Sequence, residues 1–138
     1  MKIIIFFLCI INFSIVRSQE LHLYGGKDHD VYLGCLTCDK YDSNSIWNTY
    51  GKYGNSYNKN CIWNQYGAFG NKYNSLSPWN EYSTESPVVV DKGGKFYGYF
   101  TRNKYRNKRA NFKLALLIYK YYDVIKDDVQ AAYEEIFE

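Results

Sequence analysis

The hydrophobic and polar positions of the chain predict two β-hairpins, a central repeat and a helical end. Val88 to Val90 is a short β-branched run, Asp91-Lys92-Gly93-Gly94 is a turn, and a second extended run covers Phe96 to Thr101. This order of strand, glycine-containing turn and strand is typical of a β-hairpin.

A similar segment lies earlier in the chain. Val31–Tyr41 (VYLGCLTCDKY) aligns with Lys95–Tyr105 (KFYGYFTRNKY) at an offset of 64 residues, and an extended run with a turn precedes each segment. One hairpin alone is marginally stable, whereas two can pair. The sequence therefore predicts a small antiparallel sheet built from hairpins at residues 19–40 and 87–105.

Between the hairpins, residues 41–86 form three units with a period of sixteen. Trp47, Trp63 and Trp79 recur at this spacing, and each is followed at once by Asn and three residues later by Tyr. Candidate N-caps (Asp42 or Ser43, Asn58, Ser75) begin the units, and Gly51 and Gly67 stand where a helix would end. The pattern predicts three short capped helical turns that stack their aromatic side chains.

The last segment, residues 110–137, has apolar residues at helical spacing. It predicts an amphipathic helix packed on the sheet, either unbroken or divided near Asp123. The predicted fold class is therefore α+β, with residues 19–138 as a single domain of two hairpins, aromatic repeats and a C-terminal helical part.

Residues 1–18 have the features of a cleaved signal peptide. Lys2 precedes an apolar run from Ile3 to Ile15, and Ser18 supplies a small residue at the cleavage site. We expect a secreted or periplasmic protein without a membrane span. Removal of Lys2 and Arg17 lowers the formal charge from +3 to +1 (3 − 2). A nearly neutral exported chain is not expected to bind nucleic acid.

Three cysteines remain after cleavage, so at most one intramolecular disulfide can form. Cys35 and Cys38 can pair only if the chain turns after Leu36, because neighbouring side chains of a straight strand alternate in direction. Cys61 occupies the position that serine fills in the neighbouring repeats. A bridge between Cys35 and Cys38 is slightly favoured over a bridge from either of them to Cys61.

No group of residues has the spacing of a catalytic, metal or cofactor site. The histidines, His22 and His29, are not spaced from Cys35 and Cys38 as in structural zinc sites. We therefore expect no catalytic residues, no metal, no cofactor and no enzymatic activity. An enzyme with a Cys-dependent site is a distant alternative.

Two surfaces are candidates for binding. The repeats have aromatic faces that could stack on sugar rings, with amides beside them for the hydroxyl groups: Trp47, Trp63, Trp79, Asn48, Asn64 and Asn80. In the alternative interpretation, these rings form the core and the asparagines cap turns. A basic strip could contact an anionic polymer: Arg102, Lys104, Arg106, Lys108 and Arg109.

The pattern YDSNSIWNTYGKYGNSYN, preceded by YLGCLTC and followed by SPWNEY, resembles a known group of sequences. These are uncharacterised exported bacterial proteins with tandem Tyr-Gly-x-Tyr-Gly-Ser-x-Tyr-Ser-x-x-Ser-Ile-x-Asn repeats. The resemblance covers Val31 to Tyr105 and implies export and a shared small fold, but it supplies no activity. The chain departs from the pattern at Asn55, Asn71 and Cys61.

The predicted function is that of an exported, non-catalytic repeat protein at the cell surface. It would serve as a scaffold or as a binding module, with envelope or extracellular polysaccharide, or another surface protein, as the partner. The alternative is a purely structural or interaction domain with buried aromatic side chains and no small ligand. The sequence leaves the oligomeric state open.

Overall fold

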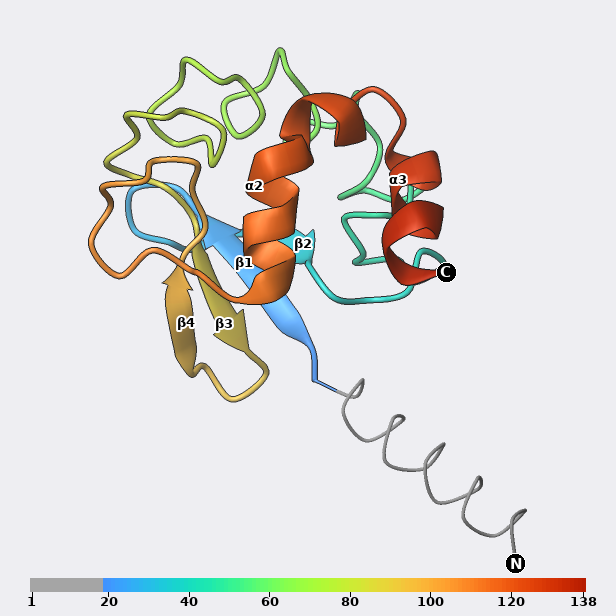
Figure 1. Cartoon of the computed structure of the whole chain (residues 1–138), viewed down its shortest axis with the longest axis horizontal. Helices are drawn as coiled ribbons and strands as arrows, with labels where there is room; N and C mark the ends of the chain where they lie inside the picture. The colour runs from blue at the N-terminus through green and yellow to red at the C-terminus, as the bar shows by residue number, and fades with distance from the viewer. Residues whose placement is uncertain (1–18) are drawn as a thin grey trace, which may run out of the picture.

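The computed structural model describes residues 19–138, so the predicted signal peptide lies outside the described residues. The elements are β1 (Leu21–Gly25), β2 (Val31–Cys35), β3 (Val88–Asp91), β4 (Phe96–Tyr99), α2 (Lys113–Ile125) and α3 (Val129–Phe137) (Figure 1). The predicted α+β class with a small antiparallel sheet is confirmed. Among residues 19–138, neither helix is long and apolar enough to cross a membrane.

The four strands form one sheet in the order β2-β1-β3-β4. Strand β1 pairs with β2 on one side and with β3 on the other, and β3 pairs with β4, all antiparallel. Leu23 lies opposite Val89 at the centre, and both side chains are fully buried. The sheet is thus half-covered: one face contributes to the core, and His22 and Tyr24 lie on the other face, half-buried.

The two strand pairs have the same geometry at positions 64 residues apart. Gly34 in β2 and Gly98 in β4 both have a positive φ, 112° and 118°, which favours glycine over residues with a side chain. A bulge lies beside each glycine in the same strand, because Leu33 of β2 and Tyr97 of β4 are extra residues between paired positions. Just after β2 and β4, similar backbone hydrogen bonds hold the chain as it leaves the sheet. The Leu36 amide donates to the Leu21 carbonyl and the Phe100 amide to the Pro87 carbonyl, both at 2.7 Å.

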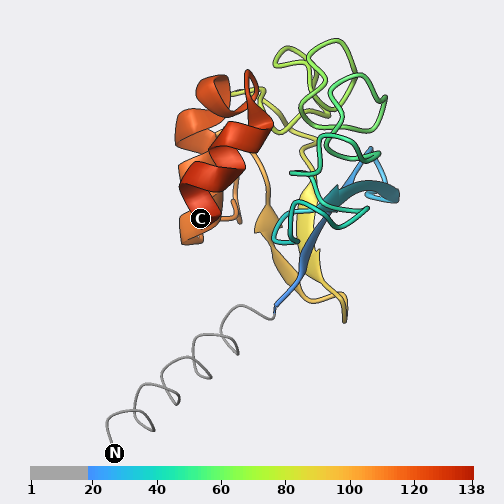
Figure 2. The same ribbon diagram turned by 90° about the vertical axis from the view of Figure 1, so that its right-hand side faces the viewer.

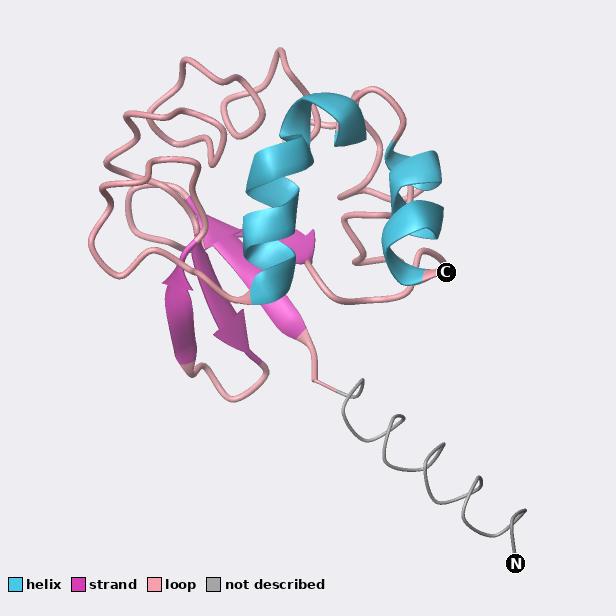
Figure 3. Cartoon of the chain, in the orientation of Figure 1, coloured by secondary structure: helices cyan, strands magenta, loops and turns pink. Residues whose placement is uncertain are grey.

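The repeat segment, residues 41–86, is a succession of turns with no helix (Figure 3). In most turns an amide donates to the carbonyl three positions earlier. In each of the first two units, one amide instead donates to the carbonyl four positions earlier (Asn55 to Gly51, Asn71 to Gly67), which completes the period of sixteen. The first residue of each turn is Asp, Asn, Ser, Gly or Cys. The prediction of helical turns is wrong, because Asx and Ser side chains bond the backbone two residues on and favour isolated turns over a helix.

The glycines also differ from the prediction. Neither Gly51 nor Gly67 has the left-handed conformation of a helix C-cap. Gly54 and Gly70 are the sterically constrained positions, because a Cβ there would overlap the backbone of Asn48 and Asn64 respectively. The second glycine of each pair therefore allows a close approach of two turns.

The C-terminal part contains two helices, which end and begin on either side of Lys126–Asp128. The Asp128 side chain caps α3 by accepting a bond from the Ala131 amide. Figure 2 shows both helices as a layer beside the sheet and the repeats. Their rings contact the repeats, with Tyr122 4.2 Å from Trp79 and Tyr133 6.0 Å from Trp47 between ring centroids. Of the two predicted arrangements, the divided helix is confirmed, with the break at Lys126–Asp128. The prediction that it packs on the sheet is corrected, because the aromatic contacts of the helices are mainly with the tryptophans.

Candidate functional site

The three tryptophans form a buried column. Their side chains are 1–3% exposed, and the ring centroids of Trp47 and Trp63 lie 5.8 Å apart and those of Trp63 and Trp79 5.3 Å apart. Each indole N–H donates to a carbonyl of the preceding turn of chain: Leu36 at 2.8 Å, Ile46 at 2.7 Å and Ile62 at 2.6 Å. The hypothesis that these rings are exposed sugar platforms is therefore wrong; they are core.

The asparagines that follow the tryptophans hold the turns in shape. The side-chain oxygens of Asn48, Asn64 and Asn80 accept bonds from the amides of the tyrosines two residues on, at 2.9–3.1 Å. The Asn48 and Asn64 amide groups also donate to carbonyls six residues earlier. Both ends of the Asn48 and Asn64 side chains, and the oxygen of Asn80, are thus used within the protein, so hydrogen bonds to a ligand are not their main role.

The most exposed aromatic side chains of residues 19–138 are tyrosines. Seven tyrosines are 80–93% exposed, and each stands two residues after an Asp or Asn whose side-chain oxygen accepts its backbone amide. We call these residues the exposed tyrosines: Tyr41, Tyr50, Tyr57, Tyr66, Tyr73, Tyr82 and Tyr105. The Asx turn fixes the backbone of each tyrosine while its ring lies in solvent.

This site was missed at the sequence level, although its signal is present. The triplet Asp/Asn-x-Tyr occurs at all seven positions, and the same triplet at Asp30-Val31-Tyr32 begins strand β2, where Tyr32 is half-buried. The triplet therefore predicts an exposed ring only where turns, not a strand, surround it.

Four of the exposed tyrosines line two equivalent hollows. The Tyr57 hollow, about 320 Å³, is formed by Ser56, Tyr57, Trp63, Asn64, Gln65 and Tyr66, with Lys126 and Asp127 opposite. The Tyr73 hollow, about 270 Å³, is formed by Lys72, Tyr73, Trp79, Asn80, Glu81 and Tyr82, with Arg102 and Asp123 opposite. The repeat residues of the second hollow each stand sixteen positions after those of the first.

Cys35 and Cys38 form a disulfide, the pairing that the sequence slightly favoured. Cys61 is a free, buried thiol among residues 19–138. Its sulfur accepts the Trp63 amide at 3.4 Å, as the hydroxyls of Ser45 and Ser77 accept the equivalent tryptophan amides. Burial raises the pKa of the Cys61 thiol to about 11, so at neutral pH it is protonated and unreactive.

The basic strip is only partly exposed. Arg102 and Arg109 donate from Nε to the carbonyls of Tyr119 and Thr101, at 3.2 and 2.8 Å. The Arg106 guanidinium lies 3.7 Å from the centroid of the Tyr99 ring. Lys104 and Lys108 are exposed. The prediction of a five-residue charged surface is corrected, because the three arginines pack on aromatic rings and backbone.

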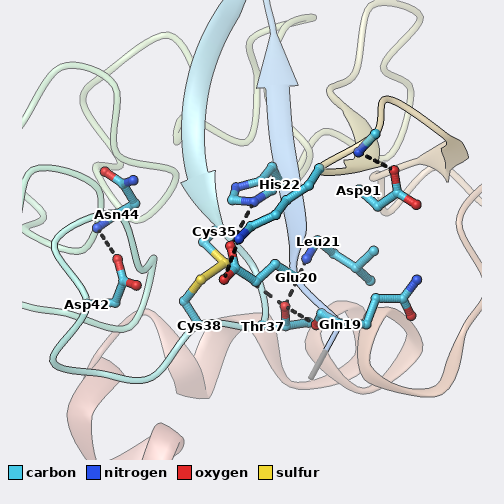
Figure 4. A network of polar contacts seen from close by, with 12 residues as sticks. Gln19, Glu20, Leu21, His22, Cys35, Thr37, Cys38, Asp42, Asn44 and Asp91 are labelled. Carbon is cyan, nitrogen blue, oxygen red and sulfur yellow. Dashed lines mark hydrogen bonds and ion pairs between the residues drawn. A yellow bond between two sulfur atoms is a disulfide. The ribbon is translucent and has the colours of Figure 1, made fainter. Parts of the chain in front are cut away.

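The outer face of the sheet holds a small polar network (Figure 4). His22 lies between the Tyr32 hydroxyl, 2.7 Å from Nδ1, and the Glu20 carboxylate, 3.3 Å from Nε2. Burial, and then the neighbouring Tyr24, raises the pKa of Tyr32 well above its ordinary value, so the hydroxyl stays protonated. Cys35 lies near Glu20 and His22, but its sulfur is bonded to Cys38 and is not available as a thiolate ligand for a metal.

Comparison with known protein families, with curated proteins and with solved structures found no match. The candidate site therefore depends on the geometry of this chain, and its defining feature is the set of exposed tyrosines.

Proposed function

We propose that the chain is an exported, non-catalytic binding module that holds polysaccharide of the cell envelope or the extracellular medium against its exposed tyrosines. The observation that carries the proposal is the exposure of seven tyrosine rings, each at 80% or more, on backbone turns of one kind. Rings that served only to stabilise the fold would be buried, as the tryptophans are.

Tyrosine suits carbohydrate chemically. The C–H face of a sugar ring packs on an aromatic ring, and the phenol hydroxyl, as donor and acceptor, bonds sugar hydroxyl groups. Tyrosine also loses little conformational entropy on binding, because it has only two side-chain torsions. The Asx turns reduce this cost further, since the backbone is already fixed.

The test is a depletion assay. The chain from residue 19 to residue 138 is mixed with insoluble cellulose, chitin, xylan and peptidoglycan at low and high salt, and the protein left in solution is measured. We expect salt-resistant depletion by at least one neutral polymer. The double variant Tyr57→Ala/Tyr66→Ala should lose it, whereas Phe96→Ala, an exposed aromatic outside the repeats, should not.

Two outcomes would contradict the proposal. Depletion that disappears at high salt and persists in the tyrosine variant would assign binding to the exposed lysines Lys104 and Lys108. Absence of depletion by every polymer would favour a purely structural or protein-interaction role.

A further inference from the structure

The two tyrosine hollows are related almost by translation along the column of repeats. Trp63 and Trp79, which each line one of the two hollows, stack with an interplanar angle of 18° and a centroid separation of 5.3 Å. Consecutive units thus present two tyrosines, an asparagine and an indole at equivalent positions. The indole rings are nearly parallel, and their separation is close to the length of one sugar ring. A ligand that matches both hollows must itself repeat along its length.

The charges in the hollows exclude a polyanion as the best ligand. In the Tyr57 hollow, Lys126 and Asp127 form an ion pair at 3.1 Å, one cation with one anion. In the Tyr73 hollow, the cations Lys72 and Arg102 are matched by the anions Glu81 and Asp123, with 3.8 Å between Arg102 and Glu81. Each hollow is therefore formally neutral and offers both donors and acceptors, as a hydroxyl-rich chain requires.

At the equivalent position of the first repeat unit, the C-terminal end of the chain contacts Lys40 and Trp47, while Tyr41 and Tyr50 stay exposed. Lys40 pairs with Glu138 at 3.2 Å and with Glu134 at 3.5 Å, both in or after α3. The Phe137 ring packs edge-on against Trp47, with 5.5 Å between centroids. Helix α3 thus packs against the first unit where the second and third units have the two hollows.

We infer that the two hollows are consecutive subsites for neighbouring sugar units of one neutral, linear polysaccharide chain, which runs along the column of repeats. This inference depends on the proposed function and specifies its ligand. A chain that fills the first subsite presents its next unit to the second at a high effective concentration. Affinity therefore increases with chain length until both subsites are filled.

The experiment measures binding of soluble oligosaccharides of cellulose and of chitin, from the monosaccharide to the hexasaccharide, by titration calorimetry. For the wild-type chain we expect the affinity of at least one series to rise roughly a hundredfold with length and then to level off. The variants Tyr66→Ala and Tyr82→Ala each remove one exposed ring from one hollow and should each abolish most of this rise. The matched control is Tyr105→Ala, which removes an exposed tyrosine from the same kind of turn outside both hollows, and it should keep the full rise.

The outcomes separate the inference from the proposed function. Binding whose affinity does not depend on chain length, or a loss in Tyr105→Ala equal to that in Tyr66→Ala, would overturn the subsites and leave polysaccharide binding intact. Tighter binding of oligogalacturonate than of the neutral series would also overturn them, because formally neutral hollows do not select an anionic chain. If neither the oligosaccharides nor the polymers of the depletion assay bind, the proposed function fails as well.

Discussion

At the scale of single residues, each tryptophan of the repeats is held by its one polar atom. The indole N–H of Trp63 donates to the Ile46 carbonyl, 17 residues earlier, and the N–H of Trp79 donates to the Ile62 carbonyl across the same separation. These bonds join one unit to the next, while the rings supply the apolar contact. Stacking of the units therefore depends on tryptophan and not on any large apolar residue.

Replacement of Trp63 by Phe tests this dependence. The change leaves the buried Ile46 carbonyl without its donor and opens a small cavity, so we expect a loss of about 2–4 kcal/mol in the free energy of unfolding. Urea unfolding measures it. Tyr66→Phe, at a ring that is 89% exposed, should change stability by less than about 0.5 kcal/mol. Equal effects in the two variants would contradict the assignment of Trp63 to the core.

The second glycine of each pair in the repeats gives a second prediction. A methyl group at Gly70 would overlap the backbone of Asn64, whereas a methyl group at Gly93 would meet little besides the Asp91 side chain, 3.5 Å away. We expect Gly70→Ala to lower the free energy of unfolding by about 1–3 kcal/mol, because the two turns must separate. Gly93→Ala should be nearly neutral. The same unfolding measurement tests both, and a neutral Gly70→Ala would argue against close contact between these turns.

The residues that sequence could assign are those whose position follows from local pattern. The hairpin turn at Asp91-Lys92-Gly93-Gly94 is one, because its Asp and Gly serve the turn itself: the Asp91 side chain accepts the Gly93 and Lys95 amides. The burial of Trp47 and the exposure of Tyr50 could not be assigned, since both are aromatic, three residues apart, in one turn-rich segment. Only the packing of neighbouring units decides which ring is covered.

At the scale of elements, the same residue types misled the prediction of helices. Asp, Asn and Ser are favoured both at helix N-caps and in isolated turns, so Asp42, Asn58 and Ser75 fit either structure. In the fold the turns continue every three or four residues, and no helix forms in residues 41–86. The helices at the C-terminus were predictable, because their apolar spacing is a pattern that turns do not share.

The disulfide is an element-scale difference between the two otherwise equivalent hairpins. Cys35 and Cys38 correspond to Tyr99 and Arg102 at the offset of 64 residues. At the second hairpin, Arg102 instead donates to the Tyr119 carbonyl and lies 5.3 Å from the Tyr122 ring centroid. The chain that follows β4 therefore leaves the sheet in the same way as the chain that follows β2, but without a covalent bond.

We accordingly expect the double variant Cys35→Ala/Cys38→Ala to fold and to be less stable by about 2 kcal/mol, the entropy of closing a short loop. Chemical unfolding of the variant and of the reduced wild-type chain should give similar losses. Cys61→Ser provides the control, because serine occupies the equivalent position in the neighbouring units. In this variant, reduction of the disulfide should lower stability by the same amount as in the wild-type chain. A double variant that does not fold would show that the path of the chain after β2 depends on the disulfide and not on the sheet.

At the scale of the whole molecule, one core joins the sheet, the tryptophan column and both helices. It includes Leu23 and Val89 from the strands, Trp79 from the repeats, and Ile118 and Tyr133 from the helices. The exposed tyrosines are outside this core, so their removal should leave the fold intact. Several titratable groups, by contrast, are inside it. Conditions that ionise those groups act on the whole domain at once.

Alkaline pH is such a condition. Burial raises the pKa of Cys61 from 9.0 to about 11, and burial raises the pKa of Tyr119 and of Tyr122 from 10.0 to about 12. Each group releases its proton at a lower pH in the unfolded chain than in the folded chain. Their contribution to stability is therefore complete below about pH 9 and is lost as the pH rises toward 12.

We expect the urea midpoint to fall steeply between pH 9 and pH 12. Each buried group lowers the free energy of unfolding by at most about 1.4 kcal/mol per pH unit in this range. Tyr119→Phe removes one of these groups, so its midpoint should fall less steeply above pH 10, even though the loss of the bond to the Ala110 carbonyl lowers its stability at neutral pH. Tyr105→Phe, at a ring that is 93% exposed, should keep the wild-type slope. A midpoint that stays constant to pH 12 would show that the Tyr119 hydroxyl is not held in the core.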